Sequence, residues 1–223
     1  MAFPLTHLLV ADILLTRHSY DKTEASAFIL GSLAPDAVHY RTTIPSDMGG
    51  IGATKKITHL CPISEERWGS VTDNTGWIAH VKEFLQSHPG PLYAGYATHA
   101  LTDIYNNMTL WERFRTNHPK EAKKGYQSLY YQDLRNIDQR LFQELTPQVD
   151  RIWRLLAAAV PRDLPGLITA DELRAIQENI LYENYKNLEP NLSRDYSFVT
   201  YEESLAWMQD AADFVAGHMG VAS

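Results

Sequence analysis

The sequence predicts an all-α protein, organised as one domain over residues 1–223 and built from about seven or eight helices. Apolar residues recur every three or four positions through most of the chain, which is the spacing of one helix face. No Asn-Gly or Asp-Gly hairpin turn is present, and no segment alternates convincingly between polar and apolar residues. The 223 residues are 44% hydrophobic and 21% charged, which is typical of a globular chain with a sizeable core.

The first third of the chain predicts two helices followed by a long loop. Apolar spacing predicts a helix over 4–18, with Pro4 in its first turn. A second helix over about 22–33 ends before Pro35, because a residue that precedes proline disfavours the helical region. Residues 35–75 contain several Pro and Gly and little periodicity. They predict a loop, and a loop of this length within a compact domain is usually functional or disordered.

Helical periodicity resumes after this loop and continues nearly to the end of the chain. The predicted helices cover residues 76–87, 91–114, 120–144 and 147–160. Two capping boxes of the Thr-x-x-Glu type each begin a late helix, one at Thr169 with Glu172 and one at Thr200 with Glu203. The second half of the chain is therefore expected to supply helices that complete the bundle.

The composition excludes several classes of protein. A lone Cys61 cannot form an intrachain disulfide or a zinc site with two thiolates, so a metal site would rely on the nine His and on carboxylates. The net charge of −7, without a Lys/Arg block, disfavours nonspecific binding of nucleic acid. No apolar run approaches the roughly 20 residues of a membrane helix, and no basic secretory signal precedes the first helix. We therefore expect a cytoplasmic protein without a transmembrane segment.

The sharpest local motif is the pair His99 and Asp103. Because they are four residues apart in a predicted helix, both side chains lie on one face, with Cβ atoms about 5–6 Å apart. Such a pair can hold one cation from a rigid element, and the alternative is a structural polar pair between helices. Asp36 follows the break at Pro35, where its carboxylate either meets a cation or donors or lies in an exposed turn.

Four other residues are candidates for the same site. His7 lies on the apolar side of the first predicted helix and His59 lies late in the predicted loop. Each is either a metal ligand or an ordinary core or solvated imidazole. His39, three residues after Asp36, is a candidate for contact with a ligand residue or with the substrate. Asp133 is a candidate for the same role, and its alternative is structural ion pairing.

The order of these motifs resembles the zinc-dependent phospholipase C family. The opening MAFPLTHLLVAD, the break GSLAPDA, the Thr-His pair at 58–59 and the helix GYATHALTDI occur in the family's order within residues 1–112. That family is related to the zinc-dependent single-strand nucleases, and both are all-helical with a cluster of up to three zinc ions. The resemblance implies a similar fold and a His/Asp metal centre in this chain.

Carried over position by position, the resemblance implies two metal positions. Asp36, His59, His99 and Asp103 match the ligands of one zinc ion. Asp103 also matches the carboxylate that bridges to a second ion, whose imidazole ligand matches His7. The family's remaining zinc ion uses two His and a Glu downstream, and no matching His pair follows Asp103 here. The resemblance thus implies an abbreviated relative with one or two ions, zinc first, with iron, manganese or nickel as alternatives.

The function predicted from these residues is metal-dependent hydrolysis of a small phosphoric ester, either a phosphodiester or a phospholipid-like substrate. A bound divalent ion would activate water, and the resemblance implies that Asp36 helps to deprotonate or orient that water. The alternative is a noncatalytic helical protein whose His/Asp cluster binds a structural metal or another ligand. A phosphohydrolase of the HD type is disfavoured because it requires an adjacent His-Asp dipeptide, which the sequence lacks.

Overall fold

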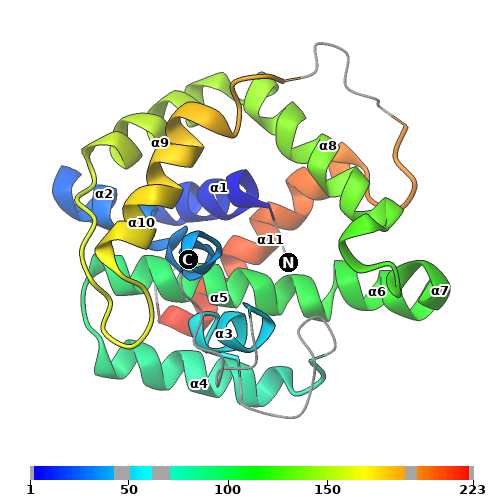
Figure 1. The fold of residues 1–223 in the computed structure, drawn as a ribbon, viewed down its shortest axis with the longest axis horizontal. Coiled ribbons are helices and arrows are strands. Elements are labelled where there is room, and N and C mark those ends of the chain that lie inside the picture. The colour runs from blue at the N-terminus through cyan, green and yellow to red at the C-terminus, as the bar shows by residue number, and fades with distance from the viewer. Residues whose placement is uncertain (1–2, 43–50, 62–70, 189–194, 221–223) are drawn as a thin grey trace.

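The computed structural model describes residues 3–42, 51–61, 71–188 and 195–220, with the backbone alone for 51–53, and these residues confirm the all-α prediction. They form eleven α-helices and no β-strand (Figure 1). The α-helices are α1 Pro4–Leu15, α2 Lys22–Gly31, α3 Ile51–Thr58, α4 Asn74–Ser87, α5 Pro91–Met108, α6 Leu110–Asn117, α7 Pro119–Ala122, α8 Leu129–Glu144, α9 Thr146–Ala158, α10 Ala170–Glu178 and α11 Tyr201–Met219. The 3-10 segments are η1 Ala34–Tyr40 and η3 Gly125–Gln127, and a π-helical segment covers Asn179–Glu183.

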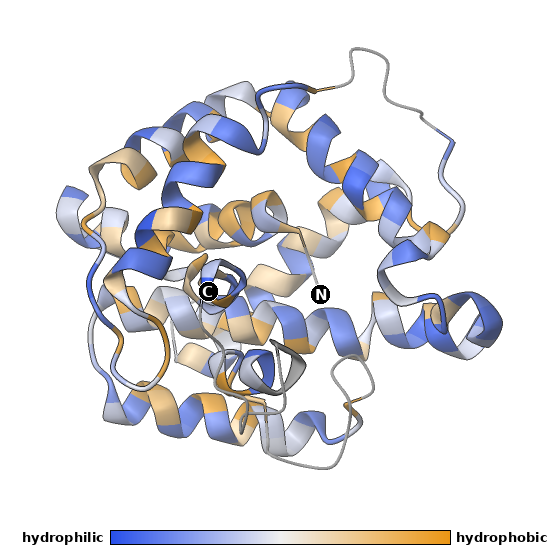
Figure 2. Cartoon of the chain, viewed as in Figure 1, coloured by the Kyte–Doolittle hydropathy of each residue, from blue (hydrophilic) through white to orange (hydrophobic). Residues whose placement is uncertain are grey.

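Helix α1 lies at the centre of the bundle. It packs against α2, α5, α8, α9 and α11, and apolar residues cover most of its surface (Figures 1 and 2). Leu5, Leu8 and Val10 have no solvent exposure. A helix that is apolar on nearly all sides is buried in a core rather than amphipathic at a surface. This placement carries His7 into the interior of the protein.

The backbones of α2 and α5 approach closely because each helix has a glycine at the contact. A Cβ atom added to Gly95 would lie 2.0 Å from the carbonyl oxygen of Phe28, and one added to Gly31 would lie 2.1 Å from that of Leu92. Both distances are far below van der Waals contact, so neither position accommodates a side chain without movement of the backbone. The contact sets the end of α2 against the first two turns of α5.

The prediction of a continuous loop over 35–75 is wrong in two places. Residues 34–40 form η1 and residues 51–58 form α3, while 43–50 and 62–70 lie outside the described residues. Isolated helices this short are marginal, and tertiary contacts stabilise them. The carbonyl oxygen of Thr58 accepts a hydrogen bond from the Tyr96 hydroxyl, and that of His59 accepts one from Trp77 Nε1 at 2.8 Å.

Two predicted helices are interrupted. The helix predicted over 91–114 breaks at Thr109, whose side-chain oxygen accepts a hydrogen bond from Trp207 Nε1 at 2.9 Å. The helix predicted over 120–144 begins only at Leu129, because Gly125 adopts a positive φ of 56° and ends the preceding turn. The break at Thr109 comes after His99 and Asp103 in the chain. The break at Gly125 precedes α8, which carries none of the five candidate metal ligands.

The two late helices begin at the predicted caps, although only one of the two predicted capping boxes is reciprocal. Thr169 and Glu172 form a reciprocal capping box at the start of α10, and the Thr200 side chain accepts a hydrogen bond from the Glu203 amide at the start of α11. Peripheral helices such as α7 and α9 carry polar residues on their outer faces (Figure 2). Within the described part of the chain, none of the helices combines the length and apolar character needed to cross a bilayer.

The first turn of α1 is capped by a side chain from another helix. Phe3, at the N-cap position, supplies no side-chain acceptor. Instead Asp138, on α8, accepts a hydrogen bond from the Leu5 amide at 3.1 Å and another from the Tyr185 hydroxyl at 2.7 Å. Burial raises the pKa of Asp138 to about 7, although these hydrogen bonds oppose the shift. The first turn of the helix that carries His7 is therefore capped by a carboxyl group whose pKa is raised.

Asp138→Asn is expected to change how stability depends on pH. The folded wild-type protein holds a proton on Asp138 up to about pH 7, whereas the unfolded chain releases it near pH 4. This group therefore contributes to stability at low pH, and the contribution is lost as pH rises towards 7. Between pH 5 and 8, the free energy of unfolding of the wild type should fall by about 2–3 kcal/mol relative to the variant.

Urea unfolding of both proteins in the presence of a chelator measures this difference directly. The variant serves as the reference because Asn keeps the shape and one acceptor oxygen, while every other titrating group is common to both proteins. Curves of unfolding free energy against pH that run parallel for the two proteins would contradict the assignment.

Candidate metal centre

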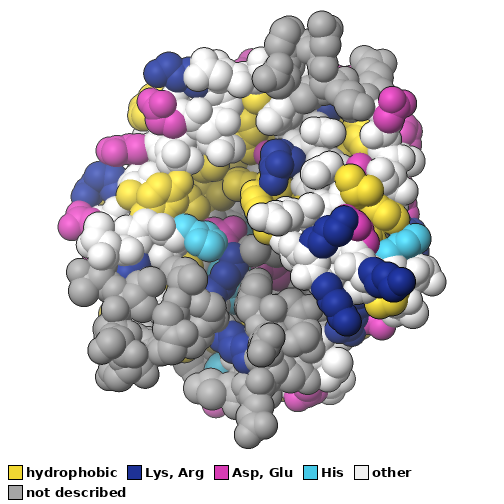
Figure 3. Space-filling model, turned by 45° about the vertical axis from the view of Figure 1, so that its right-hand side comes forward, with side chains coloured by type: hydrophobic (Ala, Val, Ile, Leu, Met, Phe, Trp, Pro, Cys, Tyr) yellow, Lys and Arg dark blue, Asp and Glu magenta, His cyan; other side chains and the backbone are white. Residues whose placement is uncertain are grey.

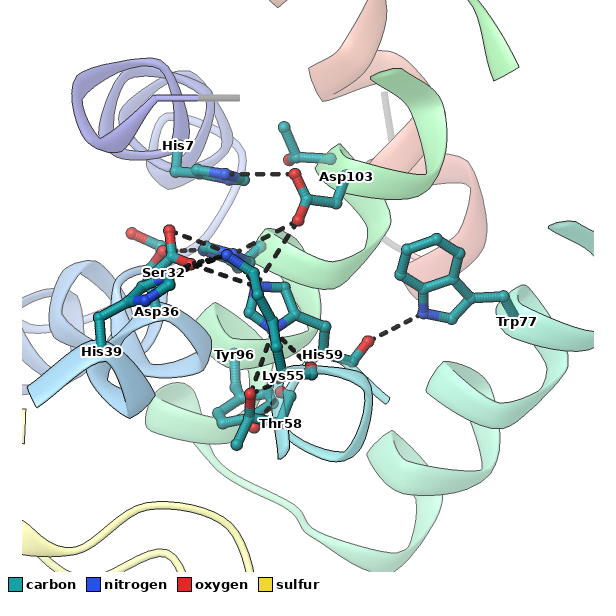
Figure 4. A network of polar contacts seen from close by, with 12 residues as sticks. His7, Ser32, Asp36, His39, Lys55, Thr58, His59, Trp77, Tyr96 and Asp103 are labelled. Atoms are coloured by element: carbon teal, nitrogen blue, oxygen red, sulfur yellow. Dashed lines mark hydrogen bonds and ion pairs between the residues drawn. The ribbon is translucent and has the colours of Figure 1, made fainter. Parts of the chain in front are cut away.

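The structure brings all five predicted metal ligands into one buried cluster (Figure 4). His7 comes from α1, Asp36 from η1, and His99 with Asp103 from α5, while His59 follows the last residue of α3. Two groups of three donors have ligand atoms within 4.8 Å of one another, and both groups contain His99. The Asp36 side chain is the most accessible of the five, with 12% of its surface exposed.

Backbone carbonyl groups orient the two central imidazoles. His99 Nδ1 lies 2.8 Å from the carbonyl oxygen of Ser32, which the α2–α5 contact sets beside α5. His59 Nδ1 lies 2.9 Å from the carbonyl oxygen of Lys55, one turn earlier. A carbonyl oxygen only accepts, so each Nδ1 carries the proton and each Nε2 presents a lone pair. This is the tautomer in which Nε2 can bind a metal.

The Nε2 lone pairs converge with carboxylate oxygens. His59 Nε2 lies 3.3 Å from His99 Nε2 and 3.3 Å from Asp36 Oδ1. Asp103 Oδ2 lies 3.7 Å from each of these imidazole nitrogens. Ligands bound tetrahedrally to zinc at 2.0–2.1 Å are separated by about 3.3 Å. The separations of each carboxylate from these two imidazole nitrogens are near that value, with 4.0 Å between His99 Nε2 and Asp36 Oδ2, while Asp36 and Asp103 belong to different groups of donors.

His7 faces the other oxygen of the same carboxylate. Its Nε2 lies 3.5 Å from Asp103 Oδ1, whereas Asp103 Oδ2 faces the imidazoles of His59 and His99. The His7 ring stacks on that of His99, with ring centroids 3.6 Å apart and planes 7° apart. Both ring nitrogens of His7 are buried and make no hydrogen bond with the described residues. This geometry suits a bridging carboxylate, with fewer protein donors for a second ion than for the first.

The two carboxylates are ionised. Burial opposes ionisation of Asp36, but the adjacent Lys55 ammonium and the nearby imidazoles of His39 and His59 hold its pKa well below the ordinary value. Burial likewise opposes ionisation of Asp103, and the adjacent His7 together with nearby positive charge lowers its pKa. Both groups therefore carry negative charge into the cluster at neutral pH.

The two central imidazoles are neutral. Burial lowers the pKa of His99 well below the ordinary value, and the adjacent His7 lowers it further. Burial also lowers the pKa of His59, although the adjacent Asp36 carboxylate opposes this change. Neutral imidazole is the form that binds metal, so proton competition for these two ligands is weaker than for exposed histidine.

Lys55 belongs to the cluster, and the sequence analysis did not find it. Its Nζ donates a hydrogen bond to Asp36 Oδ1 at 3.0 Å and one to His39 Nε2 at 2.9 Å, and 5% of its side chain is exposed. The signal was the four-residue interval between Lys55 and His59, which matches that between His99 and Asp103. A four-residue interval places two side chains on one face only within a helix, and the sequence predicts a loop over 35–75.

The two weaker candidates have different positions. His39 lies at the solvent edge of the cluster, with Nε2 3.5 Å from Asp36 Oδ1 and 47% of its side chain exposed. The structure does not bring Asp133 to the cluster. Its carboxylate accepts hydrogen bonds from consecutive backbone amides at 2.6–3.2 Å and so anchors the segment that precedes α11; these amides belong to Ser197, Phe198 and Val199.

Comparisons of the chain with protein-family models, curated proteins and solved structures find no significant match. The resemblance to the zinc-dependent phospholipase C family therefore stays a prediction. The chemistry of the centre has to be argued from its own donors. Those donors, imidazole nitrogen and carboxylate oxygen in a buried cluster, could hold a divalent metal ion.

Proposed function

We propose that this chain is a metal-dependent hydrolase of small phosphoric esters and an abbreviated relative of the zinc-dependent phospholipase C family. The observation that carries the proposal is the convergence of two imidazole lone pairs with two ionised carboxylates in a buried site. Burial of such groups together is costly unless a cation compensates them. Zinc fits this donor set best, and iron, manganese and nickel accept the same ligands.

Hydrolysis of a phosphoric ester requires an activated water and charge compensation on phosphorus. A zinc ion held by such ligands lowers the pKa of bound water to about 7 and polarises a phosphoryl oxygen. In the reaction, a bond forms between water oxygen and phosphorus, the bond from phosphorus to the alcohol oxygen breaks, and the alcohol oxygen takes up a proton. The cluster holds the negative and neutral ligands that such an ion requires.

Asp36 has the position for the residue that contacts the attacking water. Among the five candidate ligands its side chain is the most exposed, so water reaches its carboxylate before the others. The carboxylate accepts a hydrogen bond from water and thereby orients it. Because the pKa of Asp36 is well below the ordinary value, orientation is favoured over removal of the proton.

A noncatalytic metal site is the second candidate, and the burial of the cluster favours it. His7, His59 and His99 have no exposed side-chain surface, as in a closed structural site. A structural ion stabilises the fold outright, whereas a catalytic ion keeps one position open. Removal of a structural ion should therefore lower the melting temperature strongly in a protein that hydrolyses no ester.

Asp36→Asn is expected to reduce metal affinity and ester hydrolysis together. The variant replaces a charged ligand with a neutral amide and leaves the shape of the side chain unchanged. The purified wild type, the variant and the control Asp150→Asn, at an exposed position of α9, are treated with chelator and reloaded separately with zinc, iron, manganese or nickel. Rates are then measured on a phosphodiester and a phosphomonoester.

The proposal requires that hydrolysis depends on an added metal and that only the Asp36 variant loses it. Full activity of the wild type after removal of the metal would contradict it. Metal-dependent stability without hydrolysis of any ester would instead support the structural metal site.

A further inference from the structure

We propose that Lys55 forms a binding site for a phosphoryl oxyanion beside the metal centre. The inference rests on the proposed function for the identity of its ligand, which is the phosphoryl group of an ester or free phosphate. Lys55 acts in it as a fixed positive charge with hydrogen-bond donors. The resemblance assigned no role to this residue.

The environment of Lys55 is built for a buried ammonium group. Its Nζ donates to Asp36 Oδ1 at 3.0 Å and to His39 Nε2 at 2.9 Å, on the side of the cluster where His39 reaches solvent. Because an ammonium group has no acceptor, the His39 Nε2 presents its lone pair and positions Lys55. A ligand that enters past the exposed ring of His39 therefore meets Lys55 and Asp36 together.

The charges of the cluster explain why a cation is needed there. The two ionised carboxylates, Asp36 and Asp103, balance the charge of one divalent ion, and the buried imidazoles of His59 and His99 are neutral. Lys55 then gives the centre an excess positive charge within a chain of net charge −7. Figure 3 also shows Lys and Arg side chains around a recess in which acidic and histidine side chains are visible. Local positive charge of this kind attracts anionic ligands.

The same geometry gives a signature that a purely structural lysine would not produce. Lys55 competes with a metal ion for Asp36 and repels it, so loss of its charge should leave metal affinity equal or higher. Loss of the charge should at the same time weaken the binding of an anion. The expected signature is therefore a lower phosphate affinity with a metal affinity that is equal or higher.

The test measures binding of inorganic phosphate to the zinc-loaded protein by isothermal titration calorimetry. Lys55→Gln is expected to weaken phosphate binding by about 10- to 100-fold, which is the effect of losing a hydrogen bond to a charged group. Its zinc content should equal that of the wild type. Lys55→Arg keeps the charge and should keep most of the affinity. Lys56→Gln makes the same charge change at a neighbouring position of α3 and should bind phosphate as the wild type does.

Two results would overturn the proposal. One is phosphate affinity in Lys55→Gln that is unchanged while zinc is retained, and the other is equal loss in Lys55→Gln and Lys55→Arg. If Lys55→Gln does not fold, a crystal structure of the wild type with zinc and phosphate decides the question. A phosphate oxygen within hydrogen-bond distance of Lys55 Nζ supports the site, and phosphate bound elsewhere contradicts it.

The measurement also separates this inference from the proposed hydrolase function. Lys55-dependent phosphate binding in a protein that hydrolyses no ester would retain the anion site and reject the hydrolase. Hydrolysis of an ester, together with phosphate binding that does not depend on Lys55, would retain the hydrolase and reject the anion site. Dimethyl phosphate is titrated in parallel, because a dependence on Lys55 for both anions assigns the site to the ester, and a dependence for inorganic phosphate alone assigns it to the free anion.

Discussion

His99→Ala is expected to weaken metal binding severely and, with it, the proposed metal-dependent hydrolysis. His99 belongs to both groups of donors, with its Nε2 3.3 Å from His59 Nε2 and 3.7 Å from Asp103 Oδ2. Loss of a residue that only supports a metal ligand typically lowers metal affinity by about 10- to 100-fold. Loss of a ligand itself should therefore lower the zinc affinity by at least about 100-fold. Equilibrium titration with zinc against a competing chelator measures the change.

The control for this variant is His80→Ala. His80 is an exposed residue of α4, so its removal deletes an imidazole without touching the cluster. The control should bind zinc with wild-type affinity and stoichiometry. Zinc binding by His99→Ala that equals the wild type, in a protein with an unchanged circular dichroism spectrum, would show that the buried cluster is not the metal site.

Gly95→Ala is expected to destabilise the fold and to weaken the metal centre at the same time. The added methyl group would lie 2.0 Å from the carbonyl oxygen of Phe28, and backbone cannot move aside as a flexible side chain can. Overpacking of this kind costs about 1–3 kcal/mol and sometimes more, and we expect the upper end. Separation of α2 from α5 would also move the Ser32 carbonyl away from His99 Nδ1.

Gly217→Ala is the matched control. Gly217 lies within α11, and a Cβ atom there meets nothing within 4 Å. Alanine in an exposed helix interior stabilises by about 1 kcal/mol relative to glycine, so the control should gain stability. Thermal unfolding and zinc affinity are measured for both variants. A Gly95→Ala protein as stable as the wild type would contradict the close approach of the two helices.

Much of the fold could be predicted from the sequence because its signals are local. Pro91 begins α5 at the predicted residue, and the capping box at Thr169 begins α10 as predicted. The errors occur where tertiary contacts, rather than the local sequence, determine the secondary structure. The end of the eight-residue helix α3 is held by hydrogen bonds from Tyr96 to the Thr58 carbonyl and from Trp77 to that of the following residue, and no periodicity within the segment encodes them.

The candidate ligands of the site could be proposed from the sequence, whereas the groups around them could not. The four-residue interval between His99 and Asp103 is visible once a helix is assigned there. The partners that orient the imidazoles are backbone carbonyl groups, which carry no sequence signature, and one of them belongs to Ser32. Asp133 is a candidate by its position in a predicted helix. In the structure its carboxylate accepts hydrogen bonds from the backbone that precedes α11, more than sixty residues later in the chain.

The metal content of the purified wild-type protein tests the central claim most directly. The protein, freed of any histidine tag, is analysed by elemental mass spectrometry, and the chelated form is then titrated with zinc while its melting temperature is followed. A buried cluster of imidazole and carboxylate donors predicts at least one divalent ion per chain and a higher melting temperature with zinc. A metal-free protein that binds no zinc and whose melting temperature does not change with zinc would contradict the metal centre.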